Sequence, residues 1–287
     1  MAQARRTIVI PEQFPHVGFT SPRSFSDDPR KPKQLPTDID MRACEFIGPA
    51  AVLWCAVYAL LAKHQGCDTQ LLVPANLGVC VYLKSTGLMG VLQDAEVFVD
   101  DRGIRDQDDK QVVLPVSRFR TETQVDALVE AASEHLMNAD LTAANLIPVV
   151  GSVFAELASN AVQHSDSPIG ALGFIQFRRT QKGNRFICVV ADGGIGIRAA
   201  LERNPNLRDR VPYDWSAIEL AVQERVSGTG EATRGIGLYY IAQDMQLAGR
   251  QMIIHSGQGW MSVSALNDRA GRTTLFPGTL VSVEIPA

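Results

Sequence analysis

Three short motifs follow one another in the second half of the sequence, and their order restricts the fold more than any other feature. They are Glu156-Leu-Ala-Ser-Asn160-Ala-Val-Gln-His164, Asp192-Gly-Gly194-Ile-Gly196-Ile197 and Arg234-Gly235-Ile236-Gly237-Leu238. They supply a carboxylate, an amide oxygen that can hold a metal ion, an acidic acceptor for a base edge, and two glycine turns that phosphates can approach. Together these groups suit a nucleotide site of the kind that binds ATP.

The first motif predicts a stripe of polar side chains on a helix. Glu156, Asn160 and His164 are spaced at i, i+4 and i+8, which places them along one side of a helix. The apolar residues beside this stripe are Val150, Val153, Phe154, Leu157 and Ala161. A helix that buries this apolar face would hold the stripe at the edge of the core, where it can contact a ligand. A polar edge that simply faces solvent is the alternative.

The second motif is predicted to be a strand that runs into a glycine turn. Gly194 and Gly196 also match the loose fingerprint of dinucleotide-binding turns. Asp192 argues against that interpretation, because a carboxylate would repel a pyrophosphate at a helix start. An ionised carboxylate is instead a good acceptor for an exocyclic amino group such as that of adenine.

The third motif belongs to a glycine-containing loop that leads into a helix expected over residues 235–247. Backbone amides at a helix start can bind phosphate, and glycine permits the close approach. A loop followed by an ordinary helix cap is the alternative. The P-loop pattern is absent from the sequence, so this is not a nucleotide site of that kind.

The order and spacing of the three motifs resemble those of the GHKL (Bergerat-fold) ATPases, which include histidine kinases, anti-sigma-factor serine kinases and gyrase B subunits. The resemblance covers about residues 118–287. It implies that Glu156 activates water or a hydroxyl, that Asn160 is the magnesium ligand, and that Asp192 binds adenine. The other cofactor-binding residues that it implies form the pocket wall, the lid turn and a final Gly278-Thr279 motif: His164, Gly194, Gly196, Ile197, Arg234, Gly235, Ile236, Gly237, Leu238 and Thr279.

The first part of the chain resembles STAS domains, the anti-anti-sigma-like fold. The resemblance is carried by Cys44-Glu-Phe-Ile-Gly-Pro-Ala-Ala-Val-Leu and Val81-Tyr-Leu-Lys-Ser-Thr-Gly-Leu. Regulated members of that family have a phosphorylatable Ser or Thr at a strand-to-helix turn, where this chain has Gly48-Pro49-Ala50-Ala51. The resemblance therefore implies docking or sensing, without phosphorylation at the usual place.

We predict three regions along the chain: an extended, largely surface, proline-rich segment over 1–36, a STAS-like α/β domain over 37–115, and an ATPase domain over 118–287 with an ATP lid at about 198–234. The fold class is α+β. The C-terminal domain is expected to be an α/β sandwich with a mixed, mainly antiparallel sheet and helices on one face. Its strands are expected at 171–178, 185–191, 251–255, 260–265 and 279–285.

A charge-free stretch over 46–62 lies at the lower edge of membrane-spanning length. Gly48-Pro49 interrupts it, and Glu45 and Lys63 flank it. These features favour a buried helix over 49–63, and no membrane span is expected.

Composition restricts the location and partners of the protein. The formal net charge is -4, which gives no overall electrostatic case for nucleic acid or an anionic membrane. Five cysteines without a CxxC pair argue against a disulfide framework or a zinc site, and they fit a reducing cytoplasm.

Two functional hypotheses follow. In the first, the protein is a cytoplasmic Mg-ATP enzyme of the GHKL class, either an ATP hydrolase or a serine/threonine protein kinase of anti-sigma-factor type, which acts in regulation with a protein partner. In the second, ATP drives a conformational switch without turnover. Autokinase activity is not expected, because His135 is not followed by the residues typical of an acceptor histidine. A homodimer is compatible with either hypothesis.

Overall fold

The fold is a mixed α/β arrangement, seen in a computed structural model that describes residues 5–14, 35–105, 109–139, 146–181, 183–223 and 237–287. Its larger sheet has five strands in the order β10-β11-β9-β8-β7, and every neighbouring pair is antiparallel. The strands are β7 (Val112–Phe119), β8 (Ala171–Thr180), β9 (Gly183–Asp192), β10 (Gln251–Ser264) and β11 (Arg269–Pro286). This arrangement is consistent with the predicted α+β class.

One prediction about these strands is wrong. Two separate strands were expected over 251–255 and 260–265, but β10 is continuous from Gln251 to Ser264. Register shifts at Ser256, Gly257 and Gly259 let the strand stay paired with β11 through the glycines. Such bulges absorb an irregular stretch without ending the strand.

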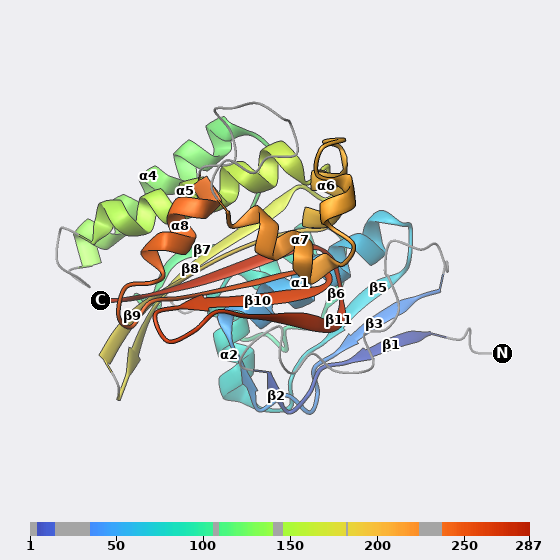
Figure 1. The fold of residues 1–287 in the computed structure, drawn as a ribbon. Coiled ribbons are helices and arrows are strands. Elements are labelled where there is room, and N and C mark those ends of the chain that lie inside the picture. Colours follow the sequence, from blue (N-terminus) through green and yellow to red (C-terminus); the bar gives the residue numbers. More distant parts are fainter. Residues whose placement is uncertain (1–4, 15–34, 106–108, 140–145, 182, 224–236) are drawn as a thin grey trace.

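Helices cover one face of the large sheet (Figure 1). They are α4 (Glu122–Ala139), α5 (Ile147–His164), α6 (Gly196–Glu202), α7 (Asp214–Ala221) and α8 (Gly237–Asp244), with a short 3-10 turn at Arg208–Arg210. Alternate side chains of β9, such as Phe186, Cys188 and Val190, pack into the core beneath these helices. This alternation is the period-two pattern that a strand with two buried faces requires.

The opposite face of the large sheet is covered by a helix from the N-terminal half of the chain. Ile187, Val189 and Ala191 of β9 share a core with helix α1 (Pro49–His64). Trp54 and Tyr58 of this helix are fully buried and stack on each other, with ring centroids 3.8 Å apart. A helix between two sheets needs apolar side chains all round, which explains its charge-free sequence.

A second sheet lies on the far side of α1. It is parallel, in the order β1-β3-β5-β6, with β1 (Arg6–Val9), β3 (Thr37–Asp40), β5 (Thr69–Leu72) and β6 (Phe98–Val99). Helices α2 (Leu77–Ser85) and α3 (Leu88–Asp94) follow β5, and a small pair joins β2 (Gln13–Phe14) to β4 (Phe46–Ile47). No helix in the described ranges is long and apolar enough to cross a membrane.

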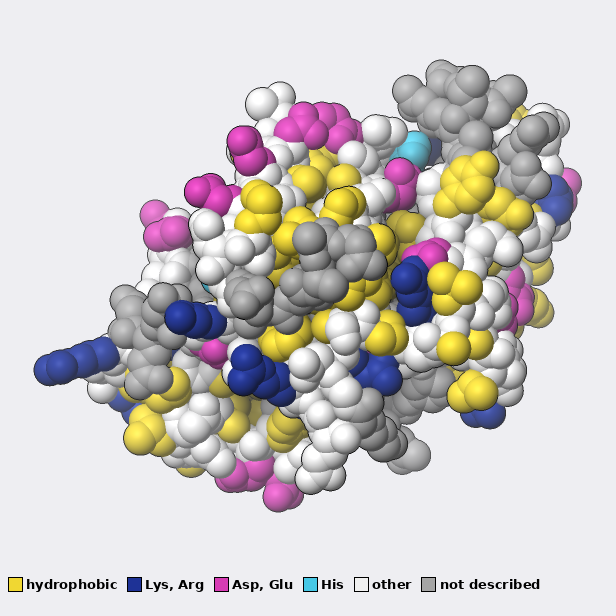
Figure 2. Space-filling view, turned by 90° about the vertical axis from the view of Figure 1, so that its left-hand side faces the viewer, with side chains coloured by type: hydrophobic (Ala, Val, Ile, Leu, Met, Phe, Trp, Pro, Cys, Tyr) yellow, Lys and Arg dark blue, Asp and Glu magenta, His cyan; other side chains and the backbone are white. Residues whose placement is uncertain are grey.

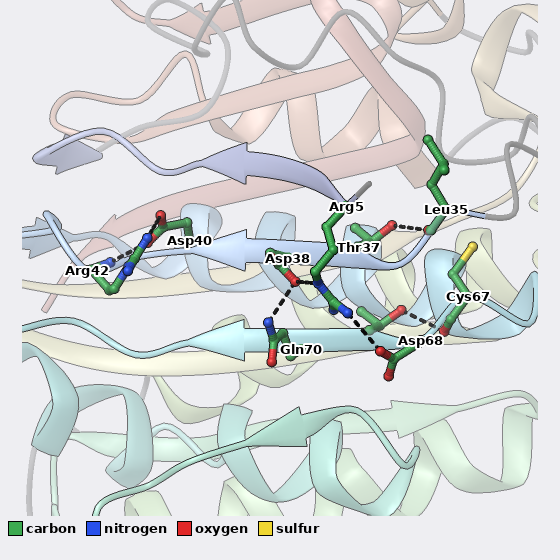
Figure 3. A network of polar contacts seen from close by, with 10 residues as sticks. Arg5, Leu35, Thr37, Asp38, Asp40, Arg42, Cys67, Asp68 and Gln70 are labelled. Carbon is green, nitrogen blue, oxygen red and sulfur yellow. Dashed lines mark hydrogen bonds and ion pairs between the residues drawn. The ribbon is translucent and has the colours of Figure 1, made fainter. Parts of the chain in front are cut away.

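Residues 5–14 depart from the extended surface segment predicted over 1–36. Ile8 is buried, because β1 completes the parallel sheet and turns one side of the strand into the core, and Ile10 and Phe14 after this strand are buried as well. Arg5 fastens this strand to its neighbours: its guanidinium lies 2.7 Å from Asp38 and 2.8 Å from Asp68 (Figure 3). Residues 15–34 lie outside the described part.

The two halves of the chain share one core. The boundary expected between 115 and 118 falls inside β7, which pairs with β8 of the large sheet. The core around α1 combines residues from the parallel sheet with Leu172, Phe174 and Phe276 of the large one. In Figure 2, which views the molecule from the left of Figure 1, hydrophobic side chains gather centrally and charges of both signs are scattered around them.

Candidate functional site

Helix α5 places the predicted polar stripe beside the large sheet. Its apolar face, with Val150, Phe154 and Leu157, is buried. Asn160 donates a hydrogen bond from Nδ2 to Glu156 Oε1 at 3.1 Å, so the two side chains form one unit on the helix. The Glu156 carboxylate lies against Gly237 at the start of α8, where a Cβ would stand only 1.5 Å from Oε1.

Asp192 ends β9, as the apolar run before it predicts. The side chain is only 4% exposed. Its Oδ1 accepts hydrogen bonds from the backbone N–H of Gly194 at 2.8 Å and of Thr279 at 3.3 Å. These two bonds fix the carboxylate between the glycine turn and β11.

The glycine turn packs directly on the end of α5. The Ile195 N–H donates to Ser165 O at 2.8 Å, and a Cβ at Gly194 would lie 1.9 Å from the same oxygen. Only glycine allows this approach of two backbones. The turn therefore brings Asp192 close to the end of the helix that carries Asn160 and His164.

Ser256 connects the start of α6 to β11. Its Oγ accepts from the Ile197 N–H at 2.8 Å and donates to Gly278 O at 3.1 Å. It also lies 3.1 Å from Thr279 Oγ1. A single buried hydroxyl thus holds the glycine turn, α6 and the Gly278-Thr279 segment together.

These elements enclose a cavity of about 380 Å³. This volume is within the range of small-molecule sites, and the walls are mainly apolar with a few polar groups, as such sites usually are. The lining residues come from α5, β9, α6, α7, α8 and β11: Leu157, Asn160, Ala161, Gln163, His164, Ser165, Val190, Asp192, Gly196, Ile197, Ala200, Leu201, Arg203, Ala221, Leu238, Thr279 and Val281.

The structure brings most of the predicted site residues together. Seven of them line the cavity: Asn160, His164, Asp192, Gly196, Ile197, Leu238 and Thr279. Three predicted residues do not line the cavity: Glu156, Gly194 and Gly237. They lie next to it, because Glu156 contacts Asn160 and Gly237, and Gly194 donates to Asp192. Arg234, Gly235 and Ile236 lie outside the described residues, as does the part of the predicted lid from 224 onward.

Several site residues were not predicted. Val190 and Val281 line the cavity from the sheet. Their place could have been inferred, because each lies two residues from a predicted site residue, Asp192 or Thr279, and so on the same face of its strand. Arg203 also lines it and forms an ion pair with Asp166, which follows α5 in the chain. Ser256 had no signal in the sequence, because its role depends on three contacts distant along the chain.

A metal at this site would need ligands beyond the protein. Within the described residues, no group of three or more His, Cys, Asp and Glu side chains is placed to hold an ion. Asn160 uses its Nδ2 for Glu156, which leaves the amide oxygen to serve a cation. A single oxygen ligand suits Mg²⁺ that is held mostly by phosphates and water.

Burial perturbs one titratable group next to the site. His255, directly before Ser256 on β10, is completely buried on the α1 side of the sheet. Its Nε2 lies 2.8 Å from Thr274 O, and desolvation lowers the pKa of the imidazole to about 4. The ring is therefore neutral at physiological pH.

No family model matches the chain, and no curated protein sequence matches it.

Proposed function

We propose that this protein binds Mg-ATP in the cavity between α5, β9 and β11, as a GHKL-type ATPase or protein kinase that acts in regulation. The observation that carries this proposal is the buried Asp192 carboxylate at the wall of a mainly apolar cavity. An apolar slot with one fixed anionic acceptor suits a flat base that presents an amino group. Adenine has this chemistry.

The polar residues of α5 would serve the phosphate end of the ligand. Asn160 lines the same cavity as Asp192, with its amide oxygen available to a cation. Magnesium would neutralise charge on the phosphates when bound. Glu156 lies one helical turn before Asn160 and would accept the proton of a water molecule or a partner hydroxyl.

Asp192→Asn tests the base-recognition role. Asparagine keeps an oxygen that can accept from Gly194 and Thr279, so the turn should stay folded. The loss of the charged acceptor should weaken ATP affinity by at least about tenfold in calorimetric titration. Asp209→Asn, on the exposed 3-10 turn, is the matched control and should bind like the wild type. Unchanged affinity in Asp192→Asn would exclude this assignment.

A non-catalytic switch is the second candidate. Glu156 already contacts both Asn160 and Gly237, so it could link helix α8 to the site without chemistry. Incubation with labelled ATP and magnesium, alone and with candidate partner proteins, separates the two functions. Release or transfer of labelled phosphate supports the enzyme, and binding with neither supports the switch.

A further inference from the structure

We propose that Leu61, on helix α1 of the N-terminal half, is a positioning residue for the turn that carries Asp192. The role of this turn in ligand binding rests on the function proposed above. Leu61 does not line the cavity, and it reaches the turn from the opposite face of the sheet. The N-terminal half would then regulate nucleotide affinity through α1.

The contact is made at Gly193, directly after Asp192. A Cβ at Gly193 would lie 2.9 Å from Leu61 Cδ2 and 3.0 Å from Ile169 Cδ1. The backbone of the turn therefore rests on the Leu61 side chain with no room for another carbon atom. The Gly193 N–H is also held, because it donates to Ser167 Oγ at 3.1 Å.

Helix α1 also supports the second backbone segment that surrounds Asp192. Tyr58 donates its hydroxyl hydrogen to Leu275 O at 2.7 Å and packs against the ring of Phe276, with centroids 6.3 Å apart. Two residues later, Gly278 lies against Asp192, where a Cβ would stand 2.2 Å from the backbone oxygen. Helix α1 thus contacts both the turn after Asp192 and the strand segment that leads to Gly278.

The rest of the N-terminal half is packed against the same helix. Ile39 of β3 and Leu71 of β5 share its core, as does Leu88 of α3. A packed core transmits displacements because it has few voids to absorb them. A partner that shifts the parallel sheet would therefore move Leu61 and change the position of Asp192.

The test compares two leucines of α1 that are equally buried. Leu53 lies two helical turns before Leu61, about 12 Å along the axis at 1.5 Å per residue. Leu53→Ala and Leu61→Ala should lower the unfolding midpoint by similar amounts. Only Leu61→Ala should weaken Mg-ATP affinity by about tenfold or more, and Leu61→Met should restore most of it. Equal effects of the two alanine variants on affinity would overturn the proposal.

A double-mutant cycle tests the contact itself. Gly193→Ala should weaken Mg-ATP binding in the wild type, because the added methyl meets the Leu61 side chain. In the Leu61→Ala background the same change should cost less, because the δ carbons are gone. An identical cost in both backgrounds would show that Leu61 does not position the turn.

A second measurement keeps this test independent of the proposed function. The Gly194 N–H, which donates to Asp192 Oδ1, should exchange with solvent faster in Leu61→Ala than in Leu53→Ala, without any ligand. Failure of the wild type to bind Mg-ATP would contradict the proposed nucleotide function but not the positioning role. Equal exchange at Gly194 in the two variants would contradict the positioning role but not the nucleotide function.

Discussion

The Cα of Gly278 lies directly against the backbone of Asp192, so that a Cβ at 278 would stand 2.2 Å from the Asp192 carbonyl oxygen and 2.8 Å from Oδ1. Gly278 also has φ of +133°, a conformation that L-residues other than glycine rarely adopt. Two strands thus meet at the acid without a side chain between them. This contact fixes the distance between Asp192 and the neighbouring Thr279.

Gly278→Ala is expected to destabilise the fold and to abolish Mg-ATP binding. Gly183→Ala is the matched control, because Gly183 also has positive φ, +111°, but nothing lies within 4 Å of its Cβ position. The control should show the backbone strain alone, about 1–2 kcal/mol. Chemical denaturation should give a larger loss for Gly278→Ala. Equal losses for the two variants would contradict the close contact.

Glu156→Gln should separate binding from turnover. Glutamine keeps the acceptor for Asn160 Nδ2, so the helix and its contact with Gly237 should persist. Mg-ATP affinity should stay within about threefold of the wild type, while loss of the general base should slow turnover by about 100-fold or more. Phosphate release measured at saturating ATP checks this. Turnover that persists at the wild-type rate would place the base elsewhere. Glu156→Ala should, like Glu156→Gln, keep Mg-ATP binding and slow turnover.

Much of the candidate site could be predicted from local patterns. The spacing of Glu156, Asn160 and His164 predicts one helical side, and the apolar run before Asp192 predicts a strand that ends at a turn. Both predictions are confirmed as secondary structure. They depend on periodicity within one element, which needs no knowledge of the tertiary fold.

The arrangement of the two halves could not be predicted in the same way. The charge-free sequence of α1 indicates burial, but it does not say which surfaces cover the helix. Leu61 meets Gly193 and Tyr58 meets Leu275 only after the chain has folded. Likewise, the sequence of β7 does not show to which sheet this strand belongs, because its pairing with β8 decides that.

Ser256→Ala should weaken both the site and the fold. The variant removes the acceptor for the Ile197 N–H and the donor to Gly278 O. An unpaired buried donor costs about 1–3 kcal/mol, measurable by chemical denaturation. Mg-ATP affinity should fall as well, because α6 loses its link to β11. Ser282→Ala, at another buried serine of the same sheet, is the control and should leave affinity unchanged.

His255 predicts a pH dependence of stability. The pKa of the buried imidazole is lowered to about 4, from an ordinary value of 6.5 in the unfolded chain. Above pH 6.5 the ring is neutral in both states and contributes nothing. Between pH 6.5 and 4 the unfolded chain binds a proton that the folded protein does not, so unfolding becomes easier as the pH falls. The full shift corresponds to about 3 kcal/mol, lost by about pH 4.

Denaturation at pH 7 and pH 4.5 in the wild type and in His255→Gln would measure this contribution. Glutamine can still donate to Thr274 O, the partner of His255 Nε2, but it does not titrate in this range. The wild type should therefore lose more stability between the two pH values than the variant does. An equal loss in both would mean that the buried ring is not responsible, and an NMR titration of the wild-type imidazole would then show a pKa near its ordinary value.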